Sequence, residues 1–90
     1  MKYTLHRALP TNPREPVAYV GIENARAHAV KLFRHKTVKK VFILDENKVL
    51  AGSVWREYDS PKRDWVYWYH DYKKRITRAI HPDGKPYPYR

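Results

Sequence analysis

Residues 22–36 carry the clearest periodic pattern of apolar and polar positions in the chain. Apolar residues recur three and four positions apart, and at about 100° per residue they gather on one side of a helix. Glu23 near the beginning and the cations of 34–36 near the end both complement the helix dipole. We therefore predict an amphipathic helix over 22–36 whose apolar side consists of Ile22, Ala25, Ala29, Val30, Leu32 and Phe33.

After the helix, apolar residues occur in short runs that predict strands. Residues 40–44 (KVFIL) and 49–55 (VLAGSVW) flank the turn-forming residues 45–48, and this combination predicts a hairpin. Residues 65–72 and 75–80 predict a third and a fourth strand of the same meander. The predicted fold class is α+β in two layers, with one amphipathic helix packed on an antiparallel β-meander of three to four strands in the order β(β)αβββ(β).

Before the helix, weaker alternation predicts a strand at 2–9 and a short second strand at 17–20. The prolines of 10–16 have a fixed φ and no donor N–H, so we predict a loop there, and the prolines and glycine of 81–90 predict an irregular tail. A chain of 90 residues buries too little surface to divide between two cores, so we predict one small basic domain spanning 1–90.

The most unusual stretch is WVYWYHDYKKR, residues 65–75, in which aromatic residues crowd one strand. Side chains alternate across a strand, so one face carries Trp65, Tyr67 and Tyr69 and the other carries Val66, Trp68, His70 and Tyr72. We expect the helix to cover the face of Val66 and Trp68 and to leave the first three rings exposed. Rings on both faces also suit a core packed with cross-strand pairs, or a dimer interface.

Cations follow the aromatic strand at once, at Lys73, Lys74 and Arg75, with Arg78 shortly after them. The chain carries a formal net charge of +10, which favours a polyanionic partner such as RNA or DNA, or an acidic protein surface. Exposed rings beside cations are typical of surfaces that stack on bases and bind phosphates. The predicted nucleic-acid site therefore consists of Trp65, Tyr67, Tyr69, Lys73, Lys74, Arg75 and Arg78. Charges on a solvated edge strand are the alternative interpretation of the basic run.

Few residues suggest catalysis or a bound metal. The chain has no cysteine, and His28 and His35 lie seven positions apart rather than in the i, i+4 spacing of a helical metal pair. We expect no metal and no cofactor, and the sequence favours binding over catalysis without deciding against an enzyme. A small ribonuclease using His70, Arg75 and a tyrosine is the catalytic alternative, although the adjacent His70 and Asp71 point to opposite faces of a strand.

These patterns favour a small binding module over an enzyme. Nucleic-acid binding through an aromatic and basic sheet face is the first hypothesis, and a protein-interaction or inhibitory accessory module of phage or plasmid type, including a homodimer, is the second. No apolar run has the length of a signal peptide or of a membrane span, so we expect a cytoplasmic protein with no membrane partner.

Overall fold

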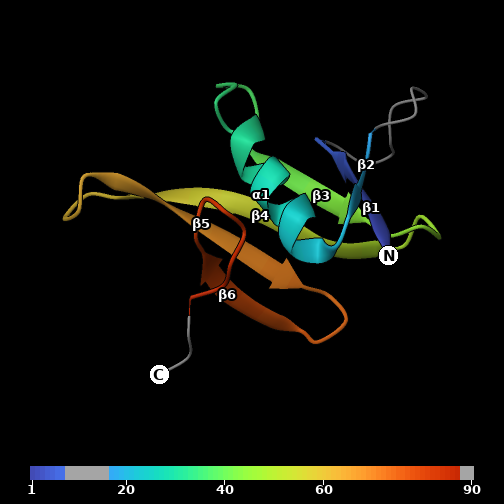
Figure 1. Ribbon diagram of the computed structural model, residues 1–90. Helices are drawn as coiled ribbons and strands as arrows, with labels where there is room; N and C mark the ends of the chain where they lie inside the picture. The colour runs from blue at the N-terminus through green and yellow to red at the C-terminus, as the bar shows by residue number, and fades with distance from the viewer. Residues whose placement is uncertain (8–16, 88–90) are drawn as a thin grey trace.

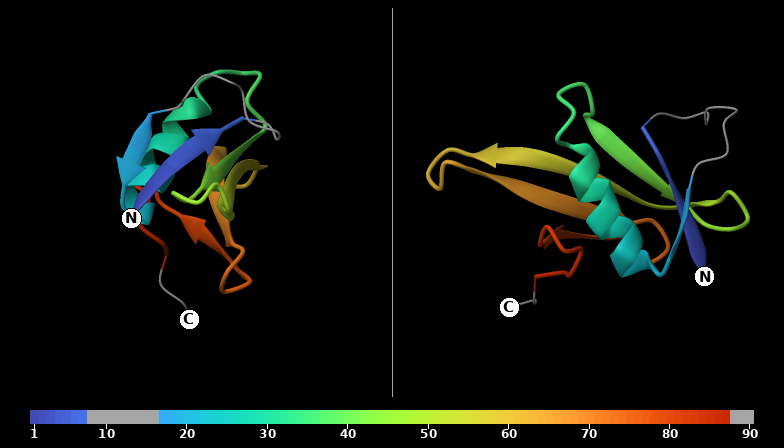
Figure 2. Two further views of the ribbon diagram at one scale, coloured as in Figure 1. Left: turned by 90° about the vertical axis from the view of Figure 1, so that its right-hand side faces the viewer. Right: turned by 45° about the horizontal axis from the view of Figure 1, so that its top comes forward.

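The computed structural model describes residues 1–7 and 17–87 and shows one helix lying across one face of a six-stranded antiparallel sheet (Figures 1 and 2). The α+β prediction is confirmed. In chain order the elements are β1 Lys2–His6, β2 Ala18–Val20, α1 Ile22–Leu32, β3 Lys40–Leu44, β4 Leu50–Asp59, β5 Asp64–Asp71 and β6 Ile76–Ile80.

The strands lie in the order β2-β1-β3-β4-β5-β6. Strands β3 to β6 form a meander of consecutive hairpins, and β1 adds to the free edge of β3 with Leu5 opposite Ile43. The short strand β2 pairs with β1 and leads directly into α1. The helix thus connects one edge of the sheet to a strand in its interior.

The core lies between α1 and the sheet. Ala25 and Ala29 are fully buried on the helix, and their small side chains allow α1 to lie close against the strands. The bulk is supplied by Phe33, which follows the helix, and by the strand residues on the same face. The largest fully buried side chains of the sheet are Val41, Ile43, Val54 and Ile80.

The helix is shorter than the sequence pattern predicts, because it ends at Leu32 with Phe33 as its C-cap. Residues 34–37 form turns, in which His35 N–H donates to the Leu32 carbonyl and Val38 N–H donates to the His35 carbonyl. Phe33 and Val38 are both buried, so the chain reverses between two anchors before it enters β3. The predicted cations of the last helical turn belong to this reversal instead.

The hairpins of the meander end in turns that are held by aspartates. Asp45 Oδ1 accepts hydrogen bonds from Asn47 and Val49 N–H, and Asp71 Oδ1 accepts them from Lys73 and Lys74 N–H. The basic run 73–75 is therefore a turn and not part of a strand, and Arg75 has φ 57°.

Residues 81–87 form no strand, but they fold back over the helix side of the sheet (Figure 1). Pro86 makes a bridge to Ile80, and the Gly84 carbonyl accepts a hydrogen bond from Arg26 Nε at 2.8 Å. Gly84 has φ 88° and lies against the Glu23 carbonyl, where a side chain would collide. The last part of the predicted tail, 88–90, and the predicted loop at 10–16 lie outside the described residues.

Candidate nucleic-acid interface

The two faces of β5 are arranged in the opposite way to the one expected from the sequence. Tyr69 lies opposite Val54, and Val54 lies opposite Val41, so all three occupy the face that α1 buries. Val66 and Trp68 consequently lie on the face away from the helix. We call this second face, opposite α1, the open face.

Tyr69 is a core residue, with only 3% of its surface exposed. Its ring fills the space left by the missing side chain of Gly52, and the Arg26 guanidinium lies 5.0 Å from the ring centroid. Burial, reinforced by the negative charge of Asp71, raises the pKa of the Tyr69 phenol to about 12. Burial likewise lowers the pKa of Arg26. A ring so enclosed has no free face on which a base could stack.

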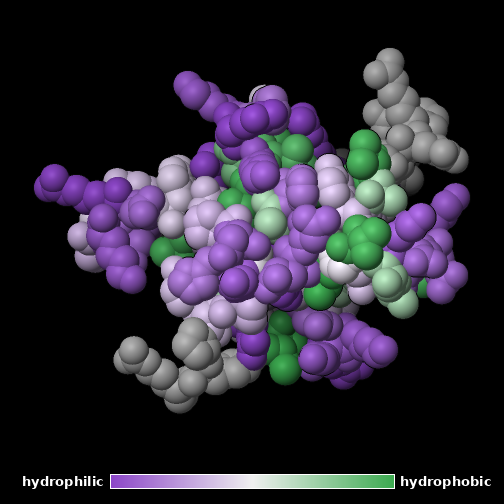
Figure 3. All heavy atoms as spheres, viewed as in Figure 1, coloured by the Kyte–Doolittle hydropathy of each residue, from purple (hydrophilic) through white to green (hydrophobic). Residues whose placement is uncertain are grey.

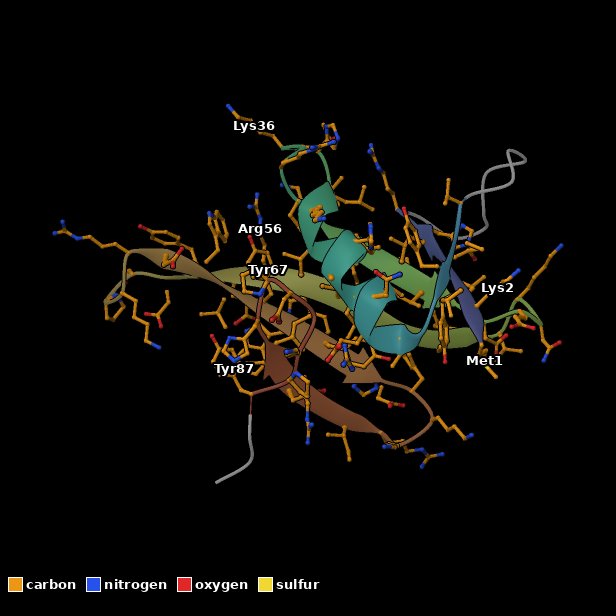
Figure 4. All side chains as sticks on the ribbon, viewed as in Figure 1. Met1, Lys2, Lys36, Arg56, Tyr67 and Tyr87 are labelled. Carbon is orange, nitrogen blue, oxygen red and sulfur yellow. The ribbon has the colours of Figure 1, made fainter. Side chains whose placement is uncertain are left out.

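Tyr67 is half-buried at the C-terminal end of α1. Its ring centroid lies 6.0 Å from that of Phe33, and it packs against the edge of the core. Figure 4 shows Tyr67 below this end of the helix, with Arg56 beside it. This position is the last one on the helix-side face of β5 that α1 covers.

Trp65 lies one pleat further along β5, beyond the reach of the helix. It is 42% exposed and makes an edge-to-face contact with Tyr58, which is 55% exposed, at a centroid distance of 5.3 Å. The Arg56 guanidinium lies 4.0 Å from the centroid of the Trp65 ring and also contacts Phe33 at 5.6 Å. We call Arg56, Tyr58 and Trp65 the hairpin cluster, because they lie where the β4–β5 hairpin extends past α1 (Figure 1).

Strand alternation separates the charges of this hairpin by face. Glu57, Asp59 and Asp64 occupy the open face, whereas Arg56 occupies the helix side with the two exposed rings. Arg56 also contacts Phe33, the residue that caps the helix. The three residues after Phe33 are basic and exposed: Arg34, His35 and Lys36. The helix side of the hairpin is therefore basic and aromatic, and from this side the protein surface is mainly hydrophilic (Figure 3).

The structure does not bring the cations predicted for this site to Trp65. Lys73, Lys74 and Arg75 are exposed in the β5–β6 turn, at the other end of β5. At about 3.3 Å per residue, Lys73 and Trp65 are about 25 Å apart. Arg78 is half-buried on β6, opposite Tyr69. Of the residues predicted for the nucleic-acid site, only Trp65 belongs to the hairpin cluster.

Arg56 and Tyr58 were not predicted as site residues. The sequence did contain a signal for these two residues, namely the turn at 59–64. Strand pairing across this turn places Tyr58 opposite Trp65 and Arg56 opposite Tyr67. The sequence pattern could not provide the length of the helix, which decides where the covered part of this face ends.

The open face carries aromatic side chains in its centre. Trp55 lies opposite Trp68, and the Lys40 ammonium lies 5.3 Å from the Trp55 ring centroid and 5.7 Å from that of Phe42. Trp68 Nε1 is buried without a hydrogen-bond partner, so the exposed part of this indole is hydrocarbon. Neighbouring positions carry Thr4, His6, Ser53, His70 and Thr77.

The histidines take part in separate local contacts. His6 Nε2 lies 2.7 Å from Thr4 Oγ1, with its pKa lowered by burial, and His70 Nδ1 lies 2.8 Å from Thr77 Oγ1. His28 stacks on Tyr19, whereas His35 lies beyond the helix end. Within residues 1–7 and 17–87 no group of three or more potential ligands could hold a metal ion. His70 and the turn residue Arg75 are not joined by any contact that would identify a catalytic site.

Comparison of the chain with protein-family models, with curated proteins and with solved structures finds no match. In the part of the chain that the structure describes, no helix is both long enough and apolar enough to cross a membrane.

Proposed function

We propose that the protein binds single-stranded nucleic acid and that the hairpin cluster is its contact surface. The observation that carries the proposal is the exposed Trp65–Tyr58 pair with the Arg56 guanidinium 4.0 Å from the indole centroid. Each exposed ring offers a surface on which an unpaired base stacks, at about 1–3 kcal/mol per base. Bases in a duplex are already stacked, which favours a single strand as the ligand.

The charges around the rings support the same ligand. The acidic residues of the hairpin strands lie on the open face, so a phosphate beside Trp65 meets the Arg56 guanidinium rather than a carboxylate. Arg56 has a second role, because its guanidinium packs against the indole and holds the ring in place. The net charge of +10 adds a long-range attraction that is independent of sequence.

The binding test is fluorescence anisotropy with labelled single-stranded RNA and DNA of the same sequence. Trp65→Ala should weaken binding about 5- to 150-fold, which is the loss of one stacked base. Arg56→Gln should reduce the dependence of log K on log salt by about 0.7, which is one phosphate contact on a single strand. The matched aromatic control is Tyr72→Ala, which removes a similarly exposed ring from the opposite end of β5 and should leave binding unchanged.

Tryptophan fluorescence provides a second readout. A Trp55→Phe/Trp68→Phe variant keeps Trp65 as the single tryptophan, and stacking on bases should quench its emission as the oligonucleotide is added. No binding at about 50 mM salt, or binding that Trp65→Ala leaves unchanged, would contradict the proposal.

A further inference from the structure

The two exposed rings of the hairpin cluster do not lie parallel to each other. Tyr58 and Trp65 lie opposite each other on β4 and β5, and their ring planes are inclined at 68° with the centroids 5.3 Å apart. Rings at opposite positions of neighbouring strands favour this edge-to-face contact, because the edge of an aromatic ring is positive and its face is negative. The cluster therefore presents two planar surfaces at a large angle to each other.

The two rings take separate bases. The Arg56 guanidinium lies 4.0 Å from the Trp65 ring centroid, so it covers one face of the indole and leaves at most the other face to a base. Tyr58 is 55% exposed, and an edge-to-face contact with Trp65 occupies no more than one of its faces. A ligand that uses both rings must consequently bring two bases to the cluster.

Two bases bound in this way cannot remain stacked on each other. A stacked base lies parallel to the ring beneath it, so bases on Tyr58 and Trp65 are inclined to each other much as the rings are. Neighbouring bases in a stacked strand are parallel and about 3.4 Å apart. The short distance between the rings suits two neighbouring nucleotides, so a strand that contacts both rings loses the stacking between these two bases.

We propose that the hairpin cluster selects single strands whose bases stack weakly, which are strands rich in uracil or thymine, over strands rich in adenine. This inference rests on the proposed nucleic-acid binding and adds a base preference to it. Adenine has two fused rings and stacks strongly on its neighbours, whereas uracil has one ring and stacks weakly. The difference between a strong and a weak stacking step corresponds to about tenfold in affinity.

A strand of adenines retains one way to bind. The base at the end of a stack can lie on Trp65 without leaving its neighbour, because its outer face is free. Such a strand leaves Tyr58 unused, whereas a strand of uracils uses both rings. Tyr58 is therefore the residue that determines the preference.

The test compares oligo(U) and oligo(A) of the same length by fluorescence anisotropy at low salt. The wild type should bind oligo(U) about tenfold more tightly. Tyr58→Ala should weaken oligo(U) binding about 5- to 150-fold, which is the loss of one stacked base, and should change oligo(A) binding by less than about twofold. Tyr58→Phe keeps the ring and should keep the preference, which would exclude a role of the phenol hydroxyl.

The matched control is Tyr72→Ala, which removes an exposed ring just beyond the other end of β5 and should leave both affinities unchanged. Circular dichroism should show that all variants are folded. If the wild type binds both strands equally, or if Tyr58→Ala weakens both by the same factor, the preference is overturned while binding by the cluster stands. If neither strand binds, or if Trp65→Ala changes neither affinity, the proposed function fails and the preference fails with it.

Discussion

Tyr69 and Trp65 share one face of β5, two pleats apart, and yet they occupy opposite environments. Tyr69 is 3% exposed between Arg26, Gly52 and the core, whereas Trp65 is 42% exposed and lies against Tyr58 and Arg56. The strand provides the same geometry at both positions. The difference arises because α1 ends at Leu32 while the β4–β5 hairpin continues past it (Figure 2).

This comparison shows how one strand can serve two purposes. Under the helix, a large ring contributes to stability because water is excluded from it. Beyond the helix, the same kind of ring adds little to stability and remains available to a ligand. A short helix on a long hairpin therefore divides a single aromatic face into a structural part and a part suited to binding.

The largest difference is expected from truncating each ring in turn. Tyr69→Ala should lower the free energy of unfolding by about 3–5 kcal/mol, since it opens a cavity in the core. Trp65→Ala should lower it by about 1 kcal/mol, the value of an exposed aromatic pair. Urea denaturation followed by circular dichroism measures both, and equal losses would show that the helix does not separate the two positions.

A second difference appears at alkaline pH. The pKa of Tyr69 is raised from 10.0 to about 12 in the folded protein, so the unfolded chain loses this proton first as pH rises. Its contribution to stability is complete below pH 10 and is lost between pH 10 and pH 12, amounting to at most about 2–3 kcal/mol. The Tyr69→Phe variant keeps all the other tyrosines, so their titration affects both proteins equally. The wild type should therefore lose more stability than this variant over that range. Parallel curves for the two proteins would contradict a buried phenol.

The third prediction concerns the space beneath the Tyr69 ring. Gly52→Ala places a methyl group against that ring and should cost about 1–3 kcal/mol. In a Tyr69→Ala background the same substitution should cost clearly less, because the obstructing ring is gone. A double-mutant cycle by urea denaturation measures this coupling, and additive effects would mean that the two positions do not touch.

The smallest effect is expected at the exposed end. Tyr58→Ala should change the free energy of unfolding by about 1 kcal/mol or less, because Tyr58 is 55% exposed and loses only its contact with Trp65. Thermal unfolding measures the change. A loss comparable to that of Tyr69→Ala would place the hairpin cluster in the core and remove its availability as a binding surface.

Much of the fold could be predicted because the sequence pattern is local. The helix, the meander and its turns follow from periodicity and from turn-forming residues such as Asp45, and the structure confirms the α+β architecture. The position of β1 between β2 and β3 could not be predicted, since this pairing joins residues far apart in the sequence.

The candidate site was less predictable than the fold. Both faces of β5 carry rings, so alternation alone could not decide which face the helix covers. The choice depends on residues elsewhere: Val41, Ile43 and Val54 share the face of Tyr69, and Gly52 leaves room for its ring. The hairpin cluster also depends on where the helix ends, which the buried Phe33 determines.

The position of β1 also has a consequence for the order of folding. The hairpins of β3 to β6 close short loops, whereas β1 reaches its place beside β3 only after a long stretch of chain has been ordered. We therefore expect the meander to form in the folding transition state and β1 to join late. Val54→Ala should mainly slow folding and Leu5→Ala should mainly speed unfolding, as stopped-flow chevron plots would show. The N-terminal strand is then added last, to a meander that is already assembled.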